Sequence, residues 1–282
     1  MNADIMSIAN ELIYGGMLKC GTPQIAAQQL QVDSTKALES VHAHGSCHTP
    51  CLFESILSPK RSVAFLNTDD IAEAKETKRG DQTQNAVESM LIAQIVSSLV
   101  AGGVAQHAIG VISPYRSQLK LLHADLEAFP HVMVDTADKF QGRDKECILV
   151  SFVRSNSTGQ VGDLLKDWRR INVALTRAKR KLICIGSQET LAHDALLNKF
   201  VHLAHRRGWS IDLPSDVLQQ HVAKQPASGV AVSLSTVARM DESLKENRET
   251  RKRNSPKVVH AGQRVLFKNG ARPILRDLKN EM

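Results

Sequence analysis

The sequence predicts an α/β fold in which helices cover both faces of a parallel sheet. Runs that are apolar at almost every position, such as residues 109–113 and 147–153, are typical of strands buried on both faces. These runs alternate along the chain with segments of helical periodicity, which is the order expected of parallel strands joined by crossover helices. A chain of 282 residues is long enough to bury such a core.

The first 100 residues predict two helices and one strand. Ile5, Ile8 and Leu12 are spaced for one helical face, so a helix is expected over residues 5–18, and Gly21 and Pro23 mark a turn after it. The other expected elements are mostly loop over 31–60, a short strand at 62–67, a charged and flexible segment at 67–84, and a strongly amphipathic helix at 85–100.

The rest of the folded region alternates regularly. The expected elements are strands at 109–113, 131–134, 147–153 and 182–186 and helices at 115–129, 164–179 and 187–206. In open parallel sheets, ligands collect at the carboxyl ends of the strands. The polar loop that follows Val134 is therefore a candidate binding site.

The net charge of +7 belongs to the end of the chain, since residues 245–282 carry eleven Lys and Arg against four Asp and Glu. Residues 222–282 are polar and are expected to be disordered, and residues 248–257 read equally well as a nuclear-import or nucleic-acid patch and as a solvated tail. The predicted organisation is an N-terminal helix and variable loop (1–61), a main domain (62–214) and a basic tail (215–282). The absence of a long apolar run predicts no membrane partner.

Arg177 is the strongest candidate for chemistry. On the helix expected over 164–179, it shares a face with Arg170 and Lys181, a pattern that usually indicates a solvated basic surface. Its neighbours from Leu175 to Ala178 are small or apolar, however, so its guanidinium is expected to be held in place. An arginine presented in this way suits the charge that develops on a phosphoryl group during its transfer.

Two stretches carry a resemblance to a known family. "DTADKFQGRDKECILVSFVRS" (135–155) resembles motif V, and "RRINVALTRAKRKLICIG" (169–186) resembles motif VI, of superfamily 1 helicases of the Upf-like group. Residues 9–21, 109–122 and 161–182 are most similar to the branch of this group that joins a helicase to a nuclease in DNA replication and repair. The resemblance covers about residues 1–214, weakly at 31–61 and 69–84. It implies a RecA-like, P-loop NTPase-type fold and 5′→3′ ATP-dependent translocation on DNA.

The resemblance also implies roles for individual residues. Arg177 resembles the arginine finger that reaches the γ-phosphate of ATP, and Asp144 takes the place of the acid that meets the ribose. Gly142 would allow close approach of the backbone to the phosphates, and Gln141 would orient that loop. On the single-stranded DNA side, the expected residues are Thr136, Tyr115 and Arg116. For Thr136 and Asp144, helix capping and turn formation remain the alternative.

The phosphate loop and the acidic pair that holds Mg²⁺ are missing from the sequence. In the family both lie on a first motor domain, so ATP with Mg²⁺ is expected to bind mainly there. The nuclease and its iron–sulfur cluster are also expected upstream, and Met1 resembles an internal methionine of a longer protein. This chain would then be the C-terminal motor half, inactive alone, with single-stranded DNA, ATP and replication and repair proteins such as a single-strand-binding protein as partners. The resemblance and the basic tail imply a nuclear location, and the resemblance leaves a mitochondrial pool open as well.

Two other functions stay open at this point. One is a stand-alone, non-catalytic module that binds nucleic acid or a partner, and the other is an RNA helicase of the same superfamily. A cluster at residues 42–51 (His42, His44, Cys47, His48 and Cys51) has the ligand types that zinc accepts. Because no second ligand pair follows at a fixed spacing, a flexible loop is favoured there and no metal is expected. Cys20, Cys147 and Cys184 are expected to be core residues.

Overall fold

The computed structural model describes residues 1–42, 47 and 51–221. Within these residues, the central feature is a six-stranded parallel sheet with the strand order β5-β4-β6-β7-β1-β8. Its strands are β1 (Val63–Asn67), β4 (Ile109–Ile112), β5 (Met133–Asp135), β6 (Lys145–Ser151), β7 (Ala178–Gly186) and β8 (Ser210–Asp212). The expected α/β, RecA-like class is confirmed.

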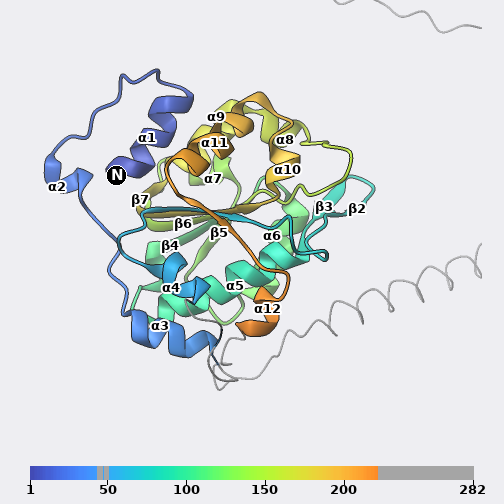
Figure 1. Cartoon of the computed structure of the whole chain (residues 1–282), viewed down its shortest axis with the longest axis horizontal. Helices are drawn as coiled ribbons and strands as arrows, with labels where there is room; N and C mark the ends of the chain where they lie inside the picture. The colour runs from blue at the N-terminus through green and yellow to red at the C-terminus, as the bar shows by residue number, and fades with distance from the viewer. Residues whose placement is uncertain (43–46, 48–50, 222–282) are drawn as a thin grey trace, which may run out of the picture. The chain divides into compact units, whose positions relative to one another are not determined.

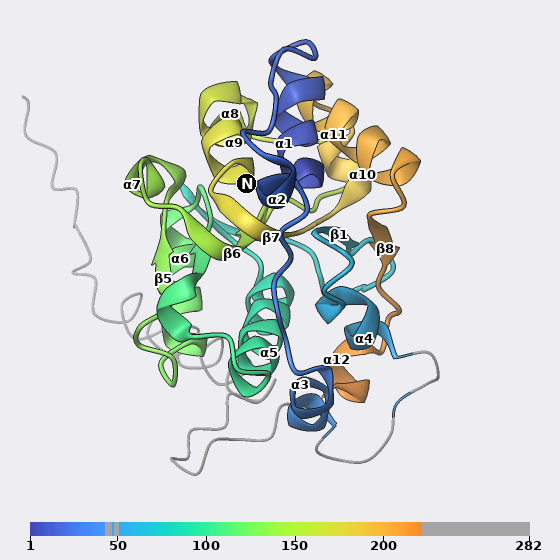
Figure 2. The same ribbon diagram turned by 90° about the vertical axis from the view of Figure 1, so that its left-hand side faces the viewer.

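Helices cover both faces of this sheet (Figures 1 and 2). One face packs against α3 (Ser34–Val41), α4 (Leu52–Leu57), α5 (Ala86–Ala101), α6 (Arg116–Asp125) and α12 (Val217–Gln220). The other packs against α1 (Ala3–Leu12), α7 (Ala137–Phe140), α8 (Asp163–Lys166), α9 (Trp168–Leu175), α10 (Gln188–Leu191) and α11 (Ala195–Arg206). Two hydrophobic clusters, one on each side of the sheet, therefore form the core.

Local sequence explains where several helices begin and end. The Asn85 side chain accepts a hydrogen bond from the Glu88 amide and so caps the start of α5. Helix α1 ends at Leu12, earlier than predicted, because Gly15 and Gly16 adopt positive φ and turn the chain. A short 3₁₀-helix, η1 (Gln106–Ala108), leads into β4, while α2 (Pro23–Ala26) buries none of its residues.

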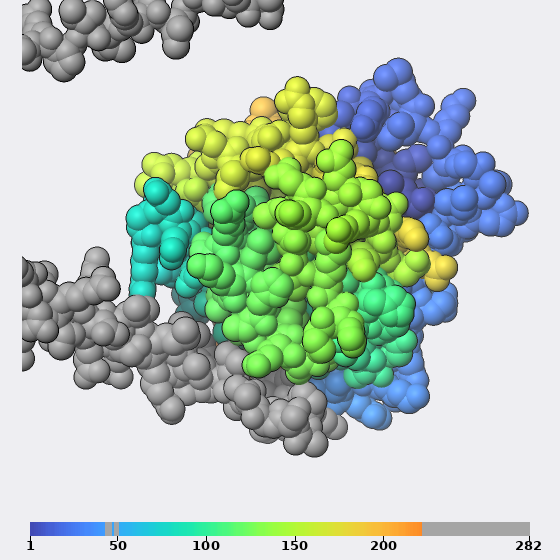
Figure 3. Space-filling model, turned by 180° about the vertical axis from the view of Figure 1, so that it is seen from behind, coloured from blue at the N-terminus to red at the C-terminus, as the bar shows by residue number. Residues whose placement is uncertain are grey.

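Two segments are more ordered than the sequence predicted. The expected loop at 31–60 contains α3 and α4, which bury Ala37 and Val41 and the residues Phe53, Ile56 and Leu57. The expected flexible segment at 67–84 buries Ile71 and Ala74 and ends in the hairpin of β2 (Thr77–Arg79) and β3 (Gln82–Gln84). Figure 3 shows this hairpin, in cyan, projecting beside the green segments that fill the centre of that face.

The last described elements also belong to the core. Strand β8 pairs with β1, and Val217 of α12 is fully buried. Cys147 and Cys184 are buried as expected, whereas Cys20 is half-buried. No helix in the described part of the chain combines the length and apolar character needed to cross a membrane. His44, His48, the patch at 248–257 and the rest of the tail from 222 onward lie outside the described residues.

Candidate functional site

Arg177 lies in the turn between α9 and β7, and not on a helix as the sequence predicted. Helix α9 ends at Leu175, and the Thr176 hydroxyl donates to the carbonyl of Asn172 (2.7 Å). Strand β7 then begins at Ala178, which is in register with Lys145 of β6. The expected basic face of Arg170, Arg177 and Lys181 therefore does not exist. Lys181 is buried on β7, and its ammonium donates to the carbonyls of Ser58 and Arg61.

Four hydrogen bonds hold Arg177 in this turn. Its guanidinium donates to Asp144 Oδ1 (2.9 Å), the Val173 carbonyl (3.2 Å) and Thr176 Oγ1 (3.1 Å). Its own carbonyl accepts from the Lys145 amide (3.0 Å). The Arg177 side chain is 21% exposed and that of Asp144 is 48% exposed. The guanidinium is thus fixed by the protein and still accessible to a ligand.

The loop of residues 141–144 lies beside Arg177 and is open to solvent. Phe140, the last residue of α7, is fully buried and fixes the start of the loop in the core. Gly142 has a φ of +76°, and a Cβ placed on it would meet no atom within 4 Å. A backbone with this conformation and open space beside it can approach a phosphate closely.

These residues lie at the amino edge of the sheet, because residues 141–144 precede β6 and Arg177 precedes β7. The general rule for parallel sheets had placed the candidate site at the carboxyl edge. Only the beginning of the polar loop lies at the carboxyl edge, since Thr136 directly follows β5. Residues 136–144 therefore run from one edge of the sheet to the other, through α7 (Figure 2).

At the carboxyl edge, Thr136 and Arg116 follow two neighbouring strands. Thr136 is half-exposed at the start of α7, and its side chain makes no capping hydrogen bond. Arg116 is exposed in the first turn of α6, which follows β4. The adjacent ends of these strands are joined by a hydrogen bond from the Ser113 amide to the Asp135 carbonyl.

Tyr115, in contrast, is buried. Its side chain belongs to the core, and its hydroxyl donates to the Val161 carbonyl (3.4 Å). Burial raises the pKa of Tyr115 above its ordinary value. The hydroxyl also lies close to Arg154 and to Gly162, so Tyr115 ties the start of α6 to the chain that follows β6. The structure thus brings Arg116 and Thr136 to the surface of one edge and places Tyr115 beneath it.

A buried polar cluster beneath the carboxyl edge of the sheet was not predicted from the sequence. Arg154 and Glu76 form an ion pair of 2.7 Å in which each side chain is only 8% exposed. Glu88 is fully buried and accepts hydrogen bonds from the Ser151 hydroxyl (2.6 Å) and the Val153 amide (2.9 Å). Desolvation outweighs these bonds and raises the pKa of Glu88 to about 8. Val153, between these partners, has a φ of +71°, an unusual conformation for a β-branched residue.

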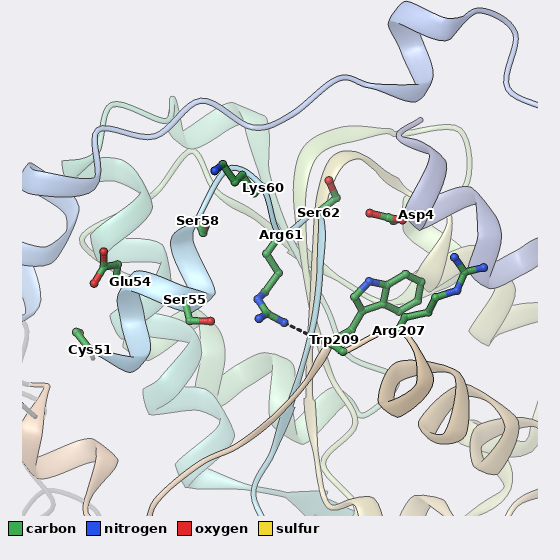
Figure 4. A pocket seen from close by; sticks show the side chains of 11 residues that line it. Asp4, Cys51, Glu54, Ser55, Ser58, Lys60, Arg61, Ser62, Arg207 and Trp209 are labelled. Atoms are coloured by element: carbon green, nitrogen blue, oxygen red, sulfur yellow. Dashed lines mark hydrogen bonds between the residues drawn. The ribbon is translucent and has the colours of Figure 1, made fainter. Parts of the chain in front are cut away.

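A separate pocket of about 680 Å³ lies near the amino ends of β1 and β8 (Figure 4). Arg61 crosses it and donates to the Gly208 carbonyl (2.6 Å), and Trp209 lies on the far side. Its basic residues (Lys60, Arg61 and Arg207) are partly offset by Asp4 and Glu54. With mixed charge and an open shape, the pocket does not select one class of ligand.

Comparisons with known proteins agree with the motifs. Residues 1–189 match a protein family described as AAA domain. The chain is 42% identical over 214 residues to the DNA replication ATP-dependent helicase/nuclease dna2 of Schizosaccharomyces pombe, and 41% identical over 218 residues to the human DNA2 protein of the same description. Each alignment covers 76% of this chain, but only 15% of the yeast protein and 20% of the human one. The chain thus spans about a fifth or less of the length of these relatives.

Proposed function

The chain belongs to the AAA domain family and is a superfamily 1 helicase motor domain of the helicase/nuclease type, and we propose that it acts as the second motor domain of an ATP-dependent 5′→3′ DNA helicase. In this proposal the amino edge of its sheet completes an ATP site whose other half lies on a first motor domain. The carboxyl edge forms part of a track for single-stranded DNA.

The position of Arg177 carries the proposal. Its guanidinium is held by Asp144, Val173 and Thr176 and remains partly exposed beside the open backbone of Gly142. In the joined motor, Arg177 would donate to the oxygens of the γ-phosphate and offset the negative charge that spreads over them in the transition state. The nearby residues Gln141 and Gly142 would line the phosphates, and Asp144 would accept from the ribose hydroxyls.

The residues at this edge fit the phosphate end of ATP and do not fit its metal. Among the described residues of this edge, Asp144 is the acid next to Arg177, and it is engaged by that arginine. Mg²⁺ prefers two or more oxygen ligands together with the phosphates. We therefore assign Mg²⁺ binding to the first motor domain, and we expect this chain alone to hydrolyse no ATP.

On the other edge, Arg116 and Thr136 would bind phosphates of single-stranded DNA. Both side chains reach solvent at neighbouring strand ends, which suits contact with successive points on a nucleic-acid backbone. Since Tyr115 is buried, its part would be to support the position of Arg116 and not to contact DNA.

Residues 136–144 connect the two edges and supply a route for coupling. A shift of Asp144 when nucleotide binds or leaves would be passed along α7 to Thr136, which lies eight positions earlier in the chain. The ATP state could then change the grip on DNA, as translocation requires. The nuclease activity, its iron–sulfur cluster and partners such as a single-strand-binding protein would belong to the larger protein, working in DNA replication and repair in the nucleus.

A reconstitution experiment tests this function. ATP hydrolysis is measured for this chain alone, for a first motor domain with the phosphate loop alone, and for one polypeptide that contains both, each with and without single-stranded DNA. We expect DNA-stimulated hydrolysis only when both domains are joined. Stimulation by RNA in place of DNA would favour an RNA helicase, and tight DNA binding without hydrolysis by the joined protein would favour a non-catalytic binding module.

A further inference from the structure

Four side chains with metal-binding atoms converge beside the core, away from the site described above. They are His42, Cys47, Cys51 and His221, and one ligand atom of each lies within 4.8 Å of the others. His42 follows α3, Cys51 precedes α4, and His221 follows α12. Figure 2 shows these three helices grouped on the same face of the sheet. In Figure 4, Cys51 lies at the outer end of the pocket, away from Arg61 and Trp209.

The contacts among these atoms have the spacing of one tetrahedral ion. Cys51 Sγ lies 3.5 Å from His42 Nε2 and 3.5 Å from His221 Nε2. Bonds of about 2.3 Å to sulfur and about 2.0–2.1 Å to nitrogen, at a tetrahedral angle, place the two ligand atoms roughly 3.6 Å apart. The remaining pairs, within 4.8 Å, need to close by only about an ångström to reach that geometry.

The surroundings of His221 prepare it as a ligand. The ring is almost fully buried and stacks on Phe53, with centroids 4.6 Å apart. Its Nδ1 lies 3.1 Å from the Val217 carbonyl, so this nitrogen carries the proton and Nε2 presents its lone pair to Cys51. A histidine that binds a metal commonly donates its other N–H to a backbone carbonyl in this way.

We propose that His42, Cys47, Cys51 and His221 form a structural zinc site that ties α12 to the connection between α3 and α4. Two thiolates and two imidazoles are a set that zinc binds with four closed positions, as in structural sites. A Rieske-type cluster fits less well, because its cysteines and histidines bind different irons, whereas here Cys51 contacts both histidines. A loop without metal was expected here because no second ligand pair follows at a fixed spacing, and the structure brings the missing ligand, His221, from 170 residues away.

A bound zinc ion would also change the protonation state of the two cysteines. Zinc binds cysteine as the thiolate, so an ion of charge +2 would displace the protons of both thiols. The result would be a cross-link between chain segments far apart in sequence, in a region where α3, α4 and α12 are all short.

The test uses the whole 282-residue chain, purified under reducing conditions without chelator. Metal analysis is expected to give about one zinc per chain, and Co²⁺ in its place to give the absorption of a tetrahedral S₂N₂ site. Cys51→Ser and His221→Ala should lose the zinc, while Cys20→Ser, a cysteine outside the cluster, should keep it. A strong chelator should lower the melting temperature of the wild type and of Cys20→Ser, but not that of Cys51→Ser.

Three results would overturn the proposal. One is wild-type protein that contains no zinc and is not stabilised by added Zn²⁺. A second is an octahedral Co²⁺ spectrum, which would indicate loose surface binding. The third is a Cys47–Cys51 disulfide recovered from protein isolated under native conditions, since these sulfurs would then not be ligands. The Co²⁺ spectrum is measured on the wild type and so remains informative even if a variant fails to fold.

Discussion

The guanidinium of Arg177 and the carboxylate of Asp144 lie 2.9 Å apart, and they come from the turns that precede two neighbouring strands, β7 and β6. The pair is reinforced by the hydrogen bond from the Lys145 amide to the Arg177 carbonyl. An exposed ion pair of this kind contributes little to stability. The ion pair matters because it positions the Arg177 guanidinium at the amino edge of the sheet, where a phosphate group can compete with Asp144 for it.

Removing Asp144 should separate nucleotide binding from the chemical step. In a protein that contains both motor domains, Asp144→Ala is expected to raise the KM for ATP about tenfold, because a hydrogen bond to a charged group is lost. The kcat should change much less, since Arg177 keeps its bonds to Val173 and Thr176. The control is Asp138→Ala, an exposed acid that pairs with Arg170. A fall in kcat with an unchanged KM would show instead that Asp144 acts only by positioning Arg177.

Arg116 should contribute one phosphate contact to single-stranded DNA. Arg116→Ala is expected to weaken binding and to reduce the slope of log K against log salt by about 0.7, the value for one contact on a single strand. Fluorescence anisotropy at several salt concentrations measures both quantities. Arg206→Ala removes an exposed arginine of α11 that pairs with Glu11, and it should leave the slope unchanged. An equal loss in the two variants would mean that only general charge attracts DNA.

Gly142 and Gly162 both have positive φ but differ in their surroundings. A Cβ on Gly162 would lie 2.5 Å from Arg154 Nη1 and 2.9 Å from the Tyr115 hydroxyl, whereas one on Gly142 meets nothing within 4 Å. Gly162→Ala should therefore destabilise the fold by about 2 kcal/mol more than Gly142→Ala, because it disturbs the buried Arg154–Glu76 pair as well as the backbone. Denaturant unfolding measures this difference. If the two variants lose the same unfolding free energy, the Arg154 side chain moves aside without cost.

The buried Glu88 predicts a pH dependence of stability. Its pKa is about 8 in the folded protein, against 4.5 as the ordinary value. The folded state therefore binds this proton more tightly, so its stabilising effect is complete below about pH 4.5 and is lost as the pH rises through about 8. Glu88→Gln should flatten the fall in unfolding free energy between pH 5 and about 8, while Glu73→Gln, an exposed residue, should not. Parallel curves for Glu88→Gln and the wild type would show that Glu88 stays ionised.

The sequence predicted the central strands well because each of them is apolar on both faces. Strand β4, for example, is buried at all four positions, and no helix could use such a short apolar run. Helices α3 and α4 escaped prediction because they have only eight and six residues and bury few side chains each. In such short elements, packing decides the conformation: α3 packs against α5, and both short helices join a hydrophobic cluster that includes residues of the sheet, far away in sequence.

The sequence did not predict that Arg177 lies in a turn. The helical pattern appeared to continue through Arg177, but from Ala178 onward the chain forms strand β7, which pairs with β6 and β1. The same competition buries Lys181, which the helical pattern had exposed. His221 could not be joined to Cys51 by any spacing rule, since 170 residues separate them. Both failures have one cause: distant strand and helix contacts override local periodicity.

The most direct measurement of the central claim is the rate of DNA-stimulated ATP hydrolysis by the Arg177→Ala variant of a protein that contains both motor domains. Arg180→Ala is the matched control, since Arg180 is a partly exposed arginine of β7 that pairs with Glu146. We expect Arg177→Ala to lower kcat by about 10³-fold or more, with ATP and DNA still bound, while Arg180→Ala stays near the wild-type rate. If the variant without Arg177 hydrolyses ATP at the wild-type rate, Arg177 is not the arginine that acts on the γ-phosphate.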